Sequence, residues 1–145
     1  MGNINTTRLA LATLVTAVLY FIFDAVIHGA IMGAETEAGI VAAGKTVEHD
    51  PIAFAYFALF DLGKALVAML FYVFARARLG VGPITAVWAG LIAWLAVEAL
   101  PAIAQMPFPF YSKWFFVKVM ALELVPMVAG AVAGAWVYRE ESSAV

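Results

Sequence analysis

The chain has 145 residues, of which 66% are apolar and only 12% are charged, and its net charge is −2. A chain of this composition cannot present the polar surface of a water-soluble protein, and its mean hydropathy of +0.98 indicates an integral membrane protein. It contains no cysteine, which excludes disulfides, thiolate metal sites and thiol nucleophiles. It also has no basic stripe, so we expect no binding to nucleic acid.

Four apolar runs are each long enough to cross a bilayer, because roughly 20 helical residues span the hydrocarbon core. The runs are apolar on nearly every face, which disfavours both a barrel of alternating strands and a water-soluble bundle. We therefore predict an all-α fold, an antiparallel four-helix transmembrane bundle forming a single domain over 1–145. The predicted spans are about 9–32, 52–75, 84–104 and 114–138.

Local signals mark where these helices begin and end. Asp50-Pro51 is typical of a helix start, the glycines and proline of 80–83 break the second span from the third, and Ser112 can cap the fourth. The second connection is short, so the second and third helices should be neighbours. In the first connection, residues 35–43 can form one short surface helix within a solvated linker.

Positive residues gather on one side of the predicted spans. Arg8, the Arg76/Arg78 pair and Arg139 flank the N-terminus, the second connection and the C-terminus, whereas the first connection sets four acids against Lys45. The positive-inside rule then predicts that both termini of this multi-pass membrane protein are cytoplasmic.

Six ionisable residues interrupt the apolar runs. Each costs roughly 2.5–3.5 kcal/mol at a helix centre, so such residues persist where they face protein or water and have a use. Antiparallel threading brings most of them to similar depths, roughly 10–14 Å inside the outer boundary at about 1.5 Å per residue. The six are Asp24, Asp61, Lys64, Glu98, Lys118 and Glu123.

Helical spacing indicates which of these side chains share a face. Tyr20 and His28 lie one turn on either side of Asp24, and Asp61 and Lys64, three residues apart, can pair along their helix. In the fourth span, Lys118 and Glu123 point in different directions. We expect Lys118 to reach outward to the headgroups and Glu123 to face the interior.

We therefore predict a buried site that binds a proton, a cation or the polar head of a ligand. We predict no metal there, because bundle di-metal sites use Glu-x-x-His pairs and only one histidine lies within a span. Haem with two axial histidines would also need His49, which lies in the first connection. The predicted site residues are Tyr20, Asp24, His28, Asp61, Lys64, Glu98 and Glu123.

Two further patterns have more than one interpretation. Residues 105–116 are rich in proline and aromatics, which suits either a membrane-interface belt or a lid over the polar site. Pro101 and Pro126 follow Glu98 and Glu123 by one turn and can kink their helices there. Gly130 and Gly134 form a GxxxG element that lets another helix approach closely, within the bundle or in a homo-oligomer.

The segment 23–29 (FDAVIHG), joined to an acidic first connection and three further spans, resembles small uncharacterised four-span membrane proteins of bacteria. The resemblance covers mainly the first span. It implies a bacterial inner-membrane protein and carries no activity with it. Small multidrug exporters also have four spans and a membrane carboxylate, but they are shorter and lack this number of acids.

Three functions remain open from the sequence. The first is a module that binds or translocates a proton, a cation or a small polar or amphiphilic ligand. The second is an accessory or assembly subunit of a larger membrane complex, whose charges pair only with each other or with partner helices. The third is an enzyme acting on a lipid, isoprenoid or quinone, which an apolar pocket opening laterally beside the carboxyls would favour.

Overall fold

The computed structural model describes residues 4–46 and 52–138. Asp50-Pro51, which we predicted to start a helix, lies outside these ranges, as do His49 and Arg139. In the described part the chain is helical and contains no strand. The elements in chain order are α1 (Thr6–Asp24), the π-helix η1 (Ala25–Ile31), α2 (Gly33–Ala42), α3 (Ala53–Leu79), α4 (Pro83–Trp94), the π-helix η2 (Leu95–Ala99), α5 (Leu100–Gln105) and α6 (Lys113–Val137).

These elements form four long apolar helices within the described ranges, which confirms the predicted all-α bundle. The membrane-spanning candidates are Thr6–Ile31, Ala53–Leu79, Pro83–Gln105 and Lys113–Val137. They coincide with the predicted spans, although α3 continues to Leu79 rather than ending near residue 75. The short helix expected in the first connection is α2.

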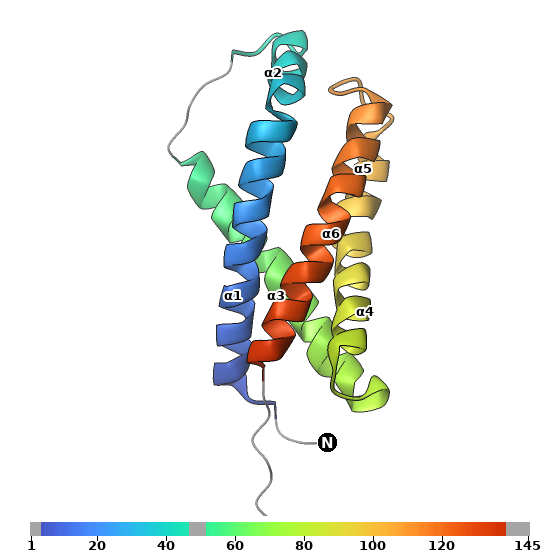
Figure 1. The fold of residues 1–145 in the computed structure, drawn as a ribbon. Helices are drawn as coiled ribbons and strands as arrows, with labels where there is room; N and C mark the ends of the chain where they lie inside the picture. Colours follow the sequence, from blue (N-terminus) through green and yellow to red (C-terminus); the bar gives the residue numbers. More distant parts are fainter. Residues whose placement is uncertain (1–3, 47–51, 139–145) are drawn as a thin grey trace, which may run out of the picture.

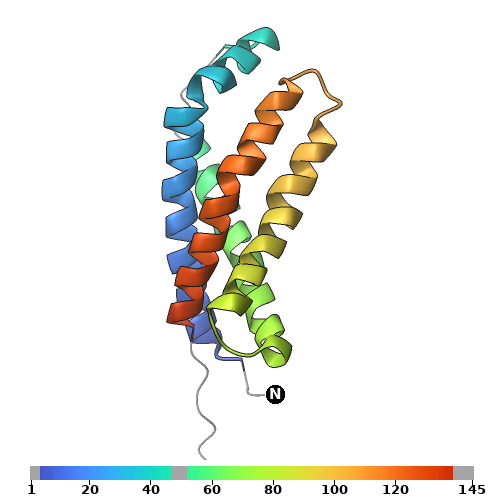
Figure 2. The ribbon, with the colours of Figure 1, turned by 45° about the vertical axis from the view of Figure 1, so that its right-hand side comes forward.

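The four spans run alternately up and down (Figure 1). α1 packs against α3 and α6, and α4 packs against the same two helices, so α3 and α4 are neighbours as predicted. Figure 2 shows α6 between α1 and α4, with α3 behind them. The start of α1 and the end of α6 lie at the same end of the bundle (Figure 1). We call the half that contains these two helix ends the proximal half and the other the distal half.

Several helix ends follow the sequence signals. The Ser112 side chain accepts a hydrogen bond of 3.1 Å from the backbone N–H of Phe115 and so caps α6 as predicted. At the break after α3, Gly80 has a φ of 84°, a conformation that favours glycine, and Pro83 opens α4. These caps hold the antiparallel turn between α3 and α4.

Helices of the proximal half approach closely through small residues. A Cβ at Gly134 would lie 2.1 Å from the Thr16 Oγ1 of α1, and one at Gly130 would lie 2.3 Å from the Tyr20 ring. The Thr16 hydroxyl donates a hydrogen bond of 3.1 Å to the carbonyl of Gly130. The GxxxG element therefore joins α6 to α1 within the bundle. Its two glycines are buried and offer no surface to a second copy. The structure therefore gives no support to a homo-oligomer that associates through Gly130 and Gly134.

Candidate functional site: a buried charge cluster

Lys64 lies at the centre of a buried set of carboxylates drawn from three helices. Its Nζ is 2.5 Å from Asp24 Oδ2, 3.0 Å from Asp61 Oδ1 and 3.1 Å from Glu98 Oε1. The Lys64 and Asp61 side chains are each 1% exposed. The pair expected along α3 is therefore present, but Lys64 also joins α1 and η2, which helical spacing alone could not reveal.

Glu123 forms a second group with His28 beside this one. The His28 Nε2 lies 3.3 Å from Glu123 Oε1, and the Glu123 side chain is 1% exposed while that of His28 is 42% exposed. Donor atoms of Asp24, His28 and Glu123 all lie within 4.8 Å of one another. Asp24 therefore belongs to both groups. We call the six residues of both groups the charge cluster: Asp24, His28, Asp61, Lys64, Glu98 and Glu123.

The charge cluster holds more acids than cations. Four carboxylates face Lys64 and His28, and even a protonated histidine would leave two negative charges without a partner among the described side chains. An uncompensated buried ion costs several kcal/mol, because the surroundings cannot replace its hydration. Among the described residues the charge cluster therefore carries an excess of negative charge, which protons or another cation would offset.

Two of the spans change to π-helical winding at the charge cluster. In η1 the amide of Met32 donates to the carbonyl of Ile27, five residues back, at 2.7 Å. In η2 the amide of Leu100 donates to the carbonyl of Leu95, also five residues back. η1 contains His28 and η2 contains Glu98. π-Helical turns occur frequently at functional sites, since they redirect side chains that an α-helix would aim elsewhere.

Only one of these two changes had a signal in the sequence. Pro101 lies two residues beyond the end of η2 and has no N–H to continue the α-helical ladder, which favours a local change of winding. The segment of η1 contains no proline, and nothing in its sequence pattern predicted the wider turn.

Tyr20, the remaining predicted site residue, lies at the edge of the charge cluster. Its hydroxyl donates a hydrogen bond of 2.9 Å to the carbonyl of Met127 on α6, and its ring centroid is 5.7 Å from Lys64 Nζ. Trp94 has a matching role that we did not predict, because its indole N–H donates to the carbonyl of Met120 at 2.9 Å. Each aromatic residue stands four positions before an acid of the charge cluster, a spacing that was visible in the sequence.

Lys118 lies outside the charge cluster and is 32% exposed, in keeping with the prediction that it points away from Glu123. It forms an ion pair with Glu35 of α2, which is 45% exposed. This partner was not predicted, because 83 residues separate the two in the chain. The pair ties α2 to α6 at the distal end.

The aromatic segment before α6 divides into two parts. Phe108, Phe110 and Trp114 are exposed, as expected for an interface belt. Tyr111 stacks on Phe115 with ring centroids 4.3 Å apart and packs so closely on α2 that a Cβ at Gly39 would lie 2.1 Å from its ring. Ile27, Met32, Ala102, Phe115 and Phe116 complete an apolar layer among η1, α5 and α6. The segment therefore supplies both a belt and part of an apolar layer.

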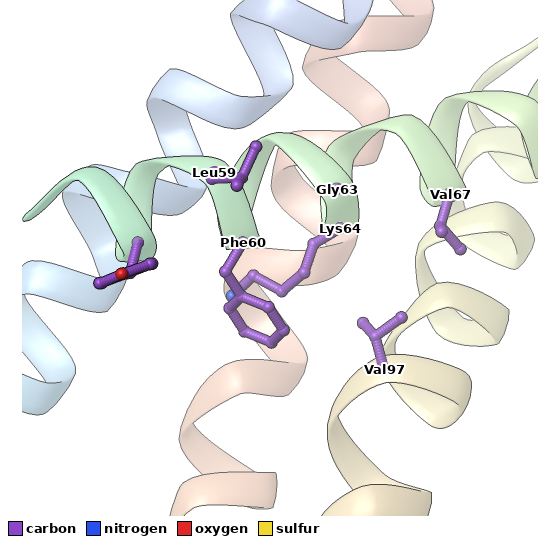
Figure 3. Close-up of a pocket in the computed structure, with 7 residues that line it drawn as sticks. Leu59, Phe60, Gly63, Lys64, Val67 and Val97 are labelled. Carbon is purple, nitrogen blue, oxygen red and sulfur yellow. The ribbon is translucent and has the colours of Figure 1, made fainter. Parts of the chain in front are cut away.

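A lateral groove of about 470 Å³ opens beside Lys64 between α3 and η2 (Figure 3). Its walls are otherwise apolar and come mostly from α3, with one residue from η2. The Phe60 ring centroid is 5.1 Å from Lys64 Nζ, and Figure 3 shows the two side chains together on the groove side of α3. The lining residues are Tyr56, Leu59, Phe60, Gly63, Lys64, Val67 and Val97.

Comparison with known proteins adds no family to this description. No protein-family model matches the chain, and no curated protein or solved structure matches it. What the fold and the contacts establish is an apolar four-helix chain of membrane-spanning character with a buried cluster of acids and a histidine.

Proposed function

We propose that this protein binds a proton or another small cation inside the membrane, at the charge cluster. The observation that carries the proposal is the excess of acids: four carboxylates lie against one lysine and one histidine among the described residues. The accessory-subunit alternative accounts less well for this excess, because a purely structural cluster would gain stability from equal numbers of acids and bases.

The arrangement suits reversible binding rather than permanent pairing. Lys64 serves three carboxylates at once, so within the described ranges none of them has an ion-pair partner of its own. Asp24 and Glu98 are 16% and 12% exposed, which leaves a path for a small ion from the rim. A cation arriving there replaces repulsion between acids by attraction, and this difference supplies the binding energy.

The experiment measures thermal unfolding of the purified protein in detergent while pH and the concentrations of NaCl, KCl and MgCl₂ are varied at constant ionic strength. A ligand that binds the folded state raises the melting temperature by mass action. We expect acid or at least one of these cations to stabilise the wild-type protein. The response should shrink in the double variant D61N/E98Q, which leaves two carboxylates opposite Lys64 and His28.

The matched control is E37Q, because Glu37 is exposed on α2 and its substitution also removes one negative charge. E37Q should respond like the wild type. A wild-type melting temperature that changes with none of these conditions would contradict the proposal, as would a D61N/E98Q response equal to that of the wild type.

The lateral groove favours a second candidate, an amphiphile whose tail lies between α3 and η2 and whose head reaches Lys64. The three carboxylates around Lys64 would repel an anionic head, so an uncharged or cationic head, as in a lipid alcohol or amine, fits better. An enzyme acting on such a lipid would use the same groove.

Native mass spectrometry of protein purified in mild detergent tests this candidate. Gly63 lines the groove, and a Cβ there meets none of the described atoms within 4 Å, so G63L places its side chain at the groove. We expect a retained lipid in the wild type and its loss in G63L. A58L adds the same side chain at an exposed position of α3 that does not line the groove, and it should retain the lipid. Equal lipid content in all three proteins would argue against the groove as its site.

A further inference from the structure

We infer that Asp24, His28 and Glu123 form a binding site for a divalent first-row transition-metal ion, with further positions open to water or a substrate. The inference rests on the proposed function and deepens it, because it names the class of cation and the residues that hold it. It departs from our sequence-based expectation of no metal.

The geometry of the donor atoms carries the first step. Ligands at about 2.0–2.2 Å from a zinc-like ion lie about 3–3.5 Å from one another. His28 Nε2 and Glu123 Oε1 are already 3.3 Å apart, and the complete set with Asp24 lies within 4.8 Å. Drawing the set in from this 4.8 Å would place three ligands on one face of an ion.

Unsatisfied buried oxygens provide a second, independent observation. The Glu123 side chain is 99% buried, yet its Oε2 has no hydrogen-bond partner among the described residues. Asp24 Oδ2 is bonded to Lys64, whereas the other carboxylate oxygen, Oδ1, is buried without a hydrogen bond in the described structure. Buried polar atoms nearly always have partners, so unbonded oxygens on two of the three residues indicate a missing ligand.

The rest of the charge cluster prepares these residues for a metal. Lys64 holds Asp24 by one oxygen and leaves the other free, the usual role of a residue that orients a metal ligand from behind. The π-helical turn η1 carries His28 on the same span as Asp24, while Glu123 comes from α6. The ion would therefore tie the first span to the fourth.

The donor set indicates the class of ion. One imidazole nitrogen with two carboxylate oxygens and no sulfur suits zinc, manganese, iron or cobalt, whereas magnesium and calcium prefer oxygen alone. His28 is 42% exposed, so the protein leaves one side of the site uncovered for a further ligand of the ion.

Cobalt(II) is the probe, because its visible absorption changes when nitrogen and oxygen ligands replace water. The protein is purified without a histidine tag, stripped with chelator and titrated with CoCl₂. We expect one equivalent of Co²⁺ to bind with a new visible spectrum. E123Q and H28Q should each weaken binding at least about tenfold. H49Q, which changes the other histidine of the chain, should bind like the wild type.

Two further variants keep the result interpretable. E123D retains a carboxylate and should bind Co²⁺ with a spectrum, although more weakly, which separates loss of a ligand from loss of fold. E37Q removes a carboxylate outside the charge cluster, where Glu37 is exposed on α2, and should keep the spectrum. Binding of Co²⁺ that is unchanged in both E123Q and H28Q, or no bound Co²⁺ in the wild type, would overturn the metal site.

The outcomes separate this inference from the function on which it rests. A protein that is stabilised by acid or an alkali cation through the charge cluster, but binds no Co²⁺, keeps the proposed function and loses the transition-metal site. A protein that responds to neither loses both.

Discussion

The two halves of the bundle are built on opposite principles. In the proximal half, Gly130 and Gly134 let α6 lie against α1 so closely that any added Cβ would overlap a neighbour. In the distal half, the helices are joined by charged side chains, with Lys64 reaching Asp24 and Glu98 on other spans. The proximal half is tight and largely apolar, whereas the distal half holds buried carboxylate oxygens that have no hydrogen bond within the described residues.

This contrast separates stability from binding. Close packing of small residues is the usual way to hold helices together in lipid, where no hydrophobic effect drives them together. Buried charges of unequal number reduce stability and are retained where a ligand makes use of them. We therefore assign the cohesion of the bundle mainly to the proximal half and the proposed cation binding to the distal half.

The largest expected effect breaks the distal half at its centre. K64M removes the cation shared by three carboxylates and should lower the free energy of unfolding by about 3–5 kcal/mol, the usual cost of leaving buried charges without a partner. Unfolding in mixed micelles by SDS titration measures the loss. K113M, at an exposed lysine where α6 begins, is the control and should change little. Equal stability of the two variants would mean that Lys64 is not the centre of the cluster.

The next effect breaks the proximal half. G130A places a methyl group against the Tyr20 ring, and G134A places one against Thr16 and Met69. Overpacking of this kind costs about 1–3 kcal/mol, measured by the same titration. G63A adds a methyl group where nothing lies within 4 Å and should be neutral or slightly stabilising, since alanine favours a helix over glycine. If G130A and G134A behaved like G63A, close packing would not hold this half together.

A smaller effect sharpens the boundary between the halves, where Tyr20 bonds to α6. Y20F removes the hydroxyl that donates to the Met127 carbonyl and should cost about 0.5–1.5 kcal/mol. The control is Y56F, because Tyr56 is 68% exposed and its loss of a hydroxyl should be silent. Because the Tyr20 hydroxyl faces α6, Y20F should leave Co²⁺ affinity unchanged. A large loss of affinity would make Tyr20 part of the binding site, as the sequence predicted.

The smallest effect concerns the distal rim. The Lys118–Glu35 pair is partly exposed, so K118Q should lower the free energy of unfolding by about 0–1 kcal/mol, and added salt should reduce the difference. The charge-swapped double variant E35K/K118E should recover what K118Q loses. A loss as large as that of K64M would show that α2 contributes more to the bundle than a surface pair allows.

Much of the fold followed from local patterns. Four apolar runs of sufficient length predicted the four spans, and the signals at Ser112 and at Gly80–Pro83 predicted helix ends that the structure has. The pairing of Asp61 with Lys64 followed from a spacing of three residues. These features depend on near neighbours in the chain, which is why sequence reasoning reached them.

The candidate site could be predicted from the sequence only in part. Its acids were identifiable because a charge in an apolar run is costly wherever the run is placed. The sharing of Lys64 by three helices, the Glu35 partner of Lys118 and the π-helical turn η1 were not identifiable, since each depends on how the helices are rotated against one another.

The sequence by itself therefore determined that the chain forms four apolar helices and that they carry more buried acid than base. Only the tertiary structure decided that Asp24, His28 and Glu123 meet at one place, that the GxxxG glycines serve the bundle rather than a second copy, and that a groove opens beside Lys64. The physical reason is that hydropathy is additive along the chain, whereas the rotation and local winding of each helix are set by packing against all the others.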